Sequence, residues 1–203
     1  MPFTSIGATT MLAPLPVVLL SCRGTTPGFD ANNLITVAWS GVVCTSPPML
    51  SVSIRPVRHS HRQILESGAF VVNLIDRQLC RAADFCGVRS GRDIDKVAAL
   101  HLHTQPLPSF PIPALQESPV VLPCTVTQRI PLGSHDLFLC RIENVYVRDS
   151  LLDEKGGVHL EKAHLVSYMH GSYHPLDPDS IGFFGYSIAG EKALKRRMKG
   201  KSS

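Results

Sequence analysis

The stretch MLSVSIRPVRHS, residues 49–60, ends a strand directly beside a group of cationic and hydroxyl side chains. Residues 49–54 alternate apolar and small polar side chains, which is the two-residue period of a half-buried strand. Pro56 has no backbone N–H and therefore stops the strand. The segment 60–67 that follows is typical of a short helix, and we expect Ser60 to be its N-cap.

A strand end, fixed arginines and a helix N-terminus together favour an anion site. Arg55 and Arg58 offer charged donors, Ser53 and Ser60 offer hydroxyl groups, and the helix dipole adds positive potential. A solvated turn whose arginines pair with local carboxylates would contain the same residue types. The stretch alone leaves both interpretations open.

Composition indicates one globular domain. The chain has 203 residues, of which 44% are apolar and 18% charged, and this length buries a large core without disulfides. The formal net charge is +4, but six basic residues in segment 192–203 contribute +6 and leave −2 for residues 1–191. The near-neutral body does not indicate nucleic-acid binding. We expect the basic tail to be a solubilising end, or else a weak contact with an anionic surface.

The six cysteines contain no C-x-x-C pair, and four of them lie in apolar runs. We therefore expect reduced thiols in a cytoplasmic protein, without disulfides or a zinc site.

Residues 17–22, VVLLSC, resemble the end of a lipoprotein signal, but no Lys or Arg precedes them and Pro14 and Pro16 interrupt the apolar stretch. We expect a first strand there. No apolar run approaches the ~20 residues of a membrane-spanning helix, so no membrane partner is expected.

The hydrophobic pattern predicts many strands and a few short helices. Strands are expected at 17–23, 34–40, 49–55, 68–74, 120–130, 137–147 and 165–169, with a hairpin turn at 131–136. Helices are expected at 60–67, 77–86 and 97–100, and residues 105–113 are expected to form a proline-rich connector. This order shows no βαβ alternation, which favours an antiparallel barrel over a doubly wound sheet.

Five segments, in order along the chain, carry a resemblance to a known family. They are NLITVAW (33–39), PPMLSVSIRPVRHS (47–60), GAFVVN (68–73), CGVRSGRDIDK (86–96) and GSHDLF (133–138), followed by Tyr168, Gly171 and Tyr173. Through them the chain resembles flavin reductase-like proteins of the FMN-binding split-barrel superfamily, most of all the flavoredoxin type, over about residues 14–187. One departure is Val97, which stands where the family commonly has phenylalanine and affects packing rather than the ligand set.

The resemblance implies a mainly β fold, an antiparallel split β-barrel of Greek-key-like order with a few short flanking helices. It also implies a homodimer that binds FMN non-covalently near the dimer interface. We expect an N-terminal arm at 1–13, an FMN-binding split-barrel domain at 14–190 and a basic C-terminal tail at 191–203.

The resemblance assigns most site residues by position. Its phosphate and ribityl contacts are Ser53, Arg55, Arg58 and Ser60; its ring-edge contacts are Asn33, Leu34, Ile35 and Thr36; and its remaining contacts are Trp39, Ser90, Arg92, Lys96, His135 and Tyr168. Lys96 would hold the negative charge that develops near the pyrimidine edge of the ring.

Several of these residues have ordinary structural interpretations as well. Trp39 and Tyr168 are also compatible with core packing, Lys96 with an exposed helix lysine, and His135 with a solvated turn. His59 and His61 are expected to be surface residues rather than ligands.

The implied function is an FMN-dependent oxidoreductase whose flavin takes a hydride from NADH or NADPH. The electrons would pass to free flavin, oxygen, a partner monooxygenase or a redox protein, and no protein side chain would act as a catalytic nucleophile or base. The alternatives are a flavoredoxin-type electron-transfer protein without its own NAD(P)H activity, and a phosphate-ligand module without redox function.

Other chemistries lack their sequence patterns. The hydrolase G-x-S-x-G elbow and the Walker and Rossmann glycine patterns are absent. His170 and His174 are four residues apart, but Gly171 and Pro175 oppose a shared helical face, so no metal site is expected. Asp93 and Asp95 are expected to cap and brace the short helix.

Overall fold

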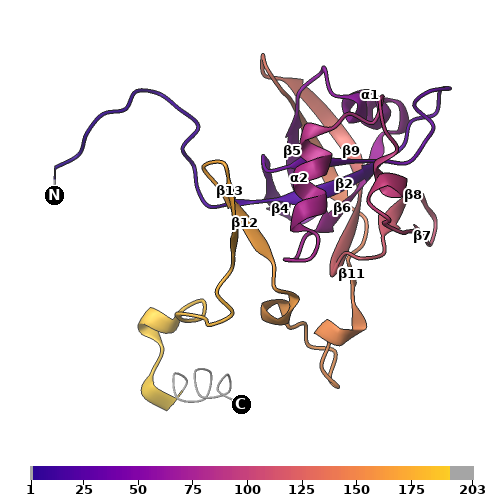
Figure 1. Cartoon of the computed structure of the whole chain (residues 1–203). Coiled ribbons are helices and arrows are strands. Elements are labelled where there is room, and N and C mark those ends of the chain that lie inside the picture. The colour runs from indigo at the N-terminus through magenta and orange to yellow at the C-terminus, as the bar shows by residue number, and fades with distance from the viewer. Residues whose placement is uncertain (1, 193–203) are drawn as a thin grey trace.

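The computed structural model describes residues 2–192 and consists mainly of antiparallel strands (Figure 1). The strands are β1 (Leu15–Pro16), β2 (Val18–Cys22), β3 (Asn33–Val37), β4 (Ser40–Thr45), β5 (Pro48–Ile54), β6 (Ala69–Leu74), β7 (Thr104–Leu107), β8 (Phe110–Leu115), β9 (Val120–Pro131), β10 (Asp136–Ile142), β11 (Tyr146–Val147), β12 (Val166–Met169) and β13 (Ser172–Pro175). The α-helices are α1 (His59–Ser67), α2 (Cys80–Val88) and α3 (Lys96–Ala99).

The main sheet runs in the order β3-β2-β6-β9-β10-β5-β4, with β11 beside β9. Its two edge strands, β3 and β4, are consecutive in sequence and are joined only by Ala38 and Trp39. The sheet therefore has to curl until its edges approach each other, and there the Ser53 N–H donates to the Trp39 carbonyl at 2.9 Å. We call the junction of β3 and β4 at residues 38–39 the seam. The fold is an antiparallel split β-barrel, which confirms the prediction.

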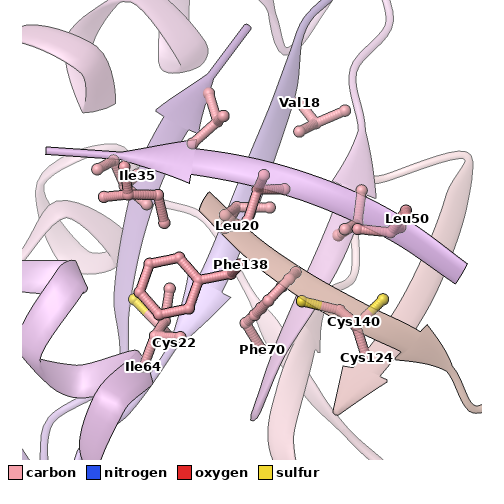
Figure 2. Packing of buried hydrophobic residues seen from close by; sticks show 14 residues of the cluster. Val18, Leu20, Cys22, Ile35, Leu50, Ile64, Phe70, Cys124, Phe138 and Cys140 are labelled. Atoms are coloured by element: carbon pink, nitrogen blue, oxygen red, sulfur yellow. The ribbon is translucent and has the colours of Figure 1, made fainter. Parts of the chain in front are cut away.

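The barrel interior is packed with apolar side chains that alternate along the strands (Figure 2). Phe70 and Phe138 are fully buried at its centre, and their rings face neighbouring aliphatic side chains. All six cysteines are free. Burial raises the pKa of Cys140 to about 12, so this thiol stays neutral and packs as a small apolar group.

A second apolar cluster attaches α2 to the outer face of β2 and β3. Leu79, Ala83 and Cys86 of the α2 region are buried against Leu19 and Leu34. Beyond the barrel, a three-stranded sheet of β1, β12 and β13 stands to one side (Figure 1). Helix α2 and the β12–β13 hairpin thus lie close to the seam, where the functional site forms.

The helix starts differ from the predictions. Helix α1 begins at His59 with Arg58 as its N-cap and without a side-chain cap bond, so the expected Ser60 cap is wrong. Helix α2 begins at Cys80, because Oδ1 of Asp76 accepts the N–H of Leu79 at 2.9 Å and holds a turn there. The cap at Asp95 is confirmed, since its side chain accepts the Ala98 N–H at 3.1 Å.

Two loop and strand predictions are also corrected. The expected connector at 105–113 forms the β7–β8 hairpin, whose short strands tolerate proline because they stand outside the main sheet. The expected strand 137–147 is interrupted after Ile142, and only Tyr146 and Val147 pair again with β9. The β9–β10 hairpin around 131–136 is confirmed.

The terminal segments stand apart from the barrel. Residues 2–13 form no helix or strand and extend away from the body (Figure 1). Most of the expected basic tail, residues 193–203, lies outside the described residues, and the division into arm, domain and tail stays a prediction. Within residues 2–192, no helix has the length and apolar character to cross a membrane.

Candidate functional site

Two neighbouring cavities lie beside the seam and share Ile35, Arg55 and Arg58 in their walls. The first has a volume of about 280 Å³. Four aromatic side chains line it, and we call it the aromatic cavity: Trp39, His135, Tyr168 and Tyr173. The second has a volume of about 250 Å³. Four basic side chains line it, and we call it the cationic cavity: Arg55, Arg58, Arg89 and Lys96.

The aromatic cavity is lined by ring pairs from separate parts of the chain. Trp39 of the seam and His135 of the β9–β10 hairpin have ring centroids 5.3 Å apart and planes tilted by 52°. Tyr168 of β12 and Tyr173 of β13 meet edge to face, with centroids 5.4 Å apart. Trp39 remains 51% exposed, so it lines an open cleft instead of filling the core. Such walls suit a flat apolar ring.

Tyr173 has a second contact that the sequence analysis missed. Burial, together with the charge of the nearby Asp84 carboxylate and a hydrogen bond to it, raises the pKa of Tyr173 to about 12. The phenol therefore stays neutral and donates its proton to Asp84. This pair fixes the tyrosine in the wall of the aromatic cavity.

The cationic cavity concentrates positive charge without a carboxylate in its lining. Among the described residues, no salt bridge involves Arg55, Arg58, Arg89 or Lys96. The walls come mainly from the end of β5, the start of α1, the end of α2 and the start of α3. Cations that have no carboxylate partner and converge from four elements form a site for an anion, which favours the anion site over the solvated turn.

Lys96 is a buried member of this cavity, with 3% of its surface exposed. Its Nζ atom donates to the carbonyls of Leu34 at 2.7 Å and Cys86 at 3.0 Å. Desolvation lowers the pKa of Lys96. The structure places it with the cationic residues and away from the aromatic walls, so its expected role beside the ring edge stays a prediction.

A buried amide network supports the cationic cavity. Nδ2 of Asn33 donates to Oγ of Ser60 at 2.8 Å and to Oε1 of Gln63 at 3.0 Å, and its Oδ1 atom is buried without a partner among the described residues. Gly91 lies so close to the Asn33 amide that a Cβ at position 91 would collide with it. Asn33 therefore positions Ser60 from behind the cavity wall.

The structure brings together eleven of the fourteen residues that the sequence analysis selected. Those in a cavity wall are Ile35, Thr36, Trp39, Ser53, Arg55, Arg58, Ser60, Ser90, Lys96, His135 and Tyr168. Asn33, Leu34 and Arg92 lie outside both walls.

Four further wall residues with a charged or aromatic side chain were missed: His59, Asp84, Arg89 and Tyr173. Arg89 and Tyr173 stood among the residues that carried the family resemblance, which was a usable signal, whereas Asp84 offered none.

The expectation of surface positions for His59 and His61 is wrong, since they are 7% and 5% exposed. The His59 ring stacks on Phe29, and the His61 ring meets Phe138 edge to face. Nε2 of His61 lies 2.8 Å from Oδ2 of Asp136, and Nη1 of Arg129 lies 3.6 Å from the same oxygen. This pair links α1, which bears Ser60, to the hairpin that bears His135.

Comparison with known proteins places the chain among flavin-related folds. Residues 11–177 match the model of the flavin reductase like domain. Flavoredoxin of Desulfovibrio vulgaris (Miyazaki F) is 28% identical, with 92% of this chain and 100% of that chain covered and a TM-score of 0.83. Nitrilotriacetate monooxygenase component B from Bacillus cereus is 20% identical, with 90% of this chain and 100% of that chain covered and a TM-score of 0.80.

A curated relative matches over a shorter span. An uncharacterized protein of Aeropyrum pernix is 30% identical over 122 residues, which are 60% of this chain and 45% of that protein. The chain thus spans about half the length of this relative.

Proposed function

Because the chain belongs to the flavin reductase-like family, we propose that it is an FMN-dependent oxidoreductase that accepts hydride from NADH or NADPH. One observation carries the proposal: a cationic cavity and an aromatic cavity adjoin and share Arg55 and Arg58. FMN has a phosphate at one end and a flat ring at the other, so the two cavities fit its two ends.

The cationic cavity supplies the phosphate contacts in this proposal. The guanidinium groups of Arg55 and Arg58 form charge-assisted hydrogen bonds to phosphate oxygens, and the Ser60 hydroxyl donates another. Asn33 holds that hydroxyl in place through its 2.8 Å bond. Ser90, beside Arg89, lines the same cavity and adds a further donor.

The aromatic cavity supplies the ring contacts. Trp39 and Tyr168 flank the ring, while His135 and the β3 residues Ile35 and Thr36 lie along its length. Bound flavin supplies the redox chemistry, taking a hydride from the nicotinamide and passing electrons to free flavin, oxygen or a partner protein. The side chains here orient the ligand and exclude water, and none acts as a nucleophile.

A flavoredoxin-type electron carrier is the second candidate. It is favoured by the 28% identity to a flavoredoxin over 92% of this chain. In that case the cavities hold the same cofactor, and electrons arrive from a protein instead of a nicotinamide.

The proposed assembly is a homodimer with the flavin near its interface. Three apolar side chains at the seam and on the edge strand β4 are well exposed, Trp39 (51%), Val42 (76%) and Val43 (51%), and a second copy would cover them. A monooxygenase as electron acceptor is suggested by the fold shared with nitrilotriacetate monooxygenase component B. Light scattering during gel filtration measures the mass and tests the dimer.

The function is tested by anaerobic absorbance of the purified protein with FMN, before and after NADH and then NADPH. A protein-bound flavin band that bleaches with either nucleotide supports the reductase and identifies the donor. A band that resists both nucleotides and bleaches with dithionite supports the electron carrier. If the protein retains no flavin when FMN is added, the phosphate contacts proposed for Arg55, Arg58 and Ser60 are wrong.

A further inference from the structure

His59 lines the cationic cavity, and the proposed reductase chemistry gives it no role. It is the first residue of α1 and is 7% exposed. Its ring stacks on Phe29 with centroids 4.7 Å apart and planes 16° from parallel. The guanidinium of Arg62 covers Phe29 at 4.3 Å from the ring centre. The imidazole is therefore held flat by packing, which fixes where its edge points.

The nitrogens of this imidazole lack hydrogen-bond partners within the described part of the chain. Nδ1 is buried and unpaired. Buried polar atoms in folded proteins are nearly always satisfied by protein, water or ligand, so an unpaired histidine in a cavity wall indicates a missing ligand. His61, two residues further along α1, differs in this respect. Its Nε2 atom lies 2.8 Å from Oδ2 of Asp136 and therefore has a partner.

The charges around His59 are almost all positive. Burial lowers the pKa of His59, and the charges of Arg92 and Lys96 lower it further, opposed only by Glu66. Arg55, Arg58 and Arg89 line the same cavity. The imidazole is therefore neutral near pH 7 while the cavity is empty, because a proton would add charge to an already cationic site.

We propose that His59 contacts the phosphate of the bound ligand and takes up a proton from solvent as that phosphate enters the cationic cavity. The inference rests on the proposed function and adds a regulation to it, since flavin retention then depends on pH. The step forms one N–H bond on the imidazole and breaks no bond in the ligand. A phosphate dianion stabilises the imidazolium ion by direct charge-assisted hydrogen bonding.

The direction of the pH dependence follows from proton counting. The complex holds one more proton than the separate partners, so His59 strengthens binding as the pH falls. The phosphate works in the opposite direction, because it loses its dianionic form below a second pKa of about 6. Wild-type titration alone thus mixes the two effects, and variants at position 59 separate them.

The experiment compares FMN with riboflavin, which lacks the phosphate, by flavin fluorescence from about pH 6 to about pH 8. The variants are His59→Gln and His59→Phe. The second keeps an aromatic ring stacked on Phe29, so it tests the phosphate contact even if the first variant fails to fold. His103→Gln is the matched control, because His103 is an exposed histidine outside both cavities that pairs with Glu117 at 2.8 Å.

We expect both position-59 variants to lose about tenfold in FMN affinity near pH 6 and less near pH 8, with riboflavin affinity unchanged. Calorimetry in two buffers of different ionisation enthalpy should show proton uptake on FMN binding by wild type and by His103→Gln, and little uptake by either position-59 variant.

Two results would overturn the inference and leave the proposed function intact. One is FMN binding by the variants with wild-type affinity, pH dependence and proton uptake. The other is an equal loss for FMN and riboflavin, which would mean that His59 only packs the site. A wild-type protein that binds no FMN overturns both proposals together.

Discussion

Two polar regions adjoin the first turn of α1, and they differ in how their charges are paired. On one side the Asp136 carboxylate pairs with both His61 and Arg129, so its charge is balanced within the chain. On the other side the cationic cavity gathers four basic residues with no carboxylate in its lining. The first arrangement compensates its charge within the fold, whereas the second leaves a charge imbalance that an anionic ligand relieves.

This difference in charge pairing distinguishes residues that stabilise the fold from residues that bind the ligand. Removing a member of the paired region should lower the free energy of unfolding. Removing one of the exposed arginines of the cationic cavity should lower ligand affinity and leave the unfolding free energy nearly unchanged.

The largest effect is expected for Asp136→Ala, which leaves the buried His61 ring and Arg129 without their carboxylate. We expect a loss of about 3 kcal/mol in unfolding free energy, the usual result of breaking a buried pair. Urea unfolding of the flavin-free protein measures it. His103→Ala breaks an exposed pair of equal length and should cost about 1 kcal/mol or less. Equal losses in the two variants would remove the distinction between paired and unpaired regions.

The next effect is expected for Arg55→Gln, at the junction of the two cavities. Loss of a charge-assisted phosphate contact of about 2 kcal/mol weakens FMN binding by about 30-fold. The unfolding free energy of the flavin-free protein should stay constant or rise, because one of several like charges is removed. A large fall in that stability, with FMN affinity intact, would place Arg55 on the structural side of the comparison.

Gly91→Ala should weaken FMN binding by displacing the Asn33 side chain. A Cβ at this position collides with the Asn33 amide, which holds the Ser60 hydroxyl. We expect FMN affinity to fall about tenfold, equivalent to one ordinary hydrogen bond of about 1.4 kcal/mol. Gly41→Ala is the control, since open space surrounds that position. Unchanged FMN affinity in Gly91→Ala would show that Asn33 does not position Ser60.

The smallest effect concerns an exposed pairing far from the cavities. Hydrogen bonds that the His159 ring donates to the carboxylates of Glu161 and Asp153 raise its pKa above the usual 6.5. Stabilisation by this pairing is thus fully present below pH 6.5 and is lost as the pH rises through the raised value. NMR titration of the His159 ring should show a midpoint above 6.5 that falls in Asp153→Asn. A midpoint at or below 6.5 in the wild type would contradict this ion-pair geometry.

Much of the fold followed from local patterns. The alternation in residues 49–54 predicted β5, and the hairpin signal at 131–136 predicted the β9–β10 pairing that carries His135 into the site. The prolines of 105–113 misled the prediction, because a hairpin outside the main sheet tolerates residues that a central strand excludes.

The part of the site that lies on consecutive residues was easier to predict from the sequence than the rest. Arg55, Arg58 and Ser60 follow one strand end, so their proximity could be read from consecutive residues. The burial of His59 and His61 depends on how α1 packs against the barrel, which no local pattern records. Asp84 reaches the cavity only because the β12–β13 hairpin returns beside α2, a contact between residues far apart in sequence.

The position of the seam limits when the barrel can close during synthesis and folding. Its two strands are neighbours in the chain, but the path between them through the sheet passes β2, β6, β9, β10 and β5. The barrel therefore cannot close until β10 has been synthesised, and the aromatic cavity is complete only once Tyr173 has followed. Such non-local pairing favours slow folding. A cofactor that needs walls from both ends of the chain stabilises the finished fold by mass action and cannot guide its early steps.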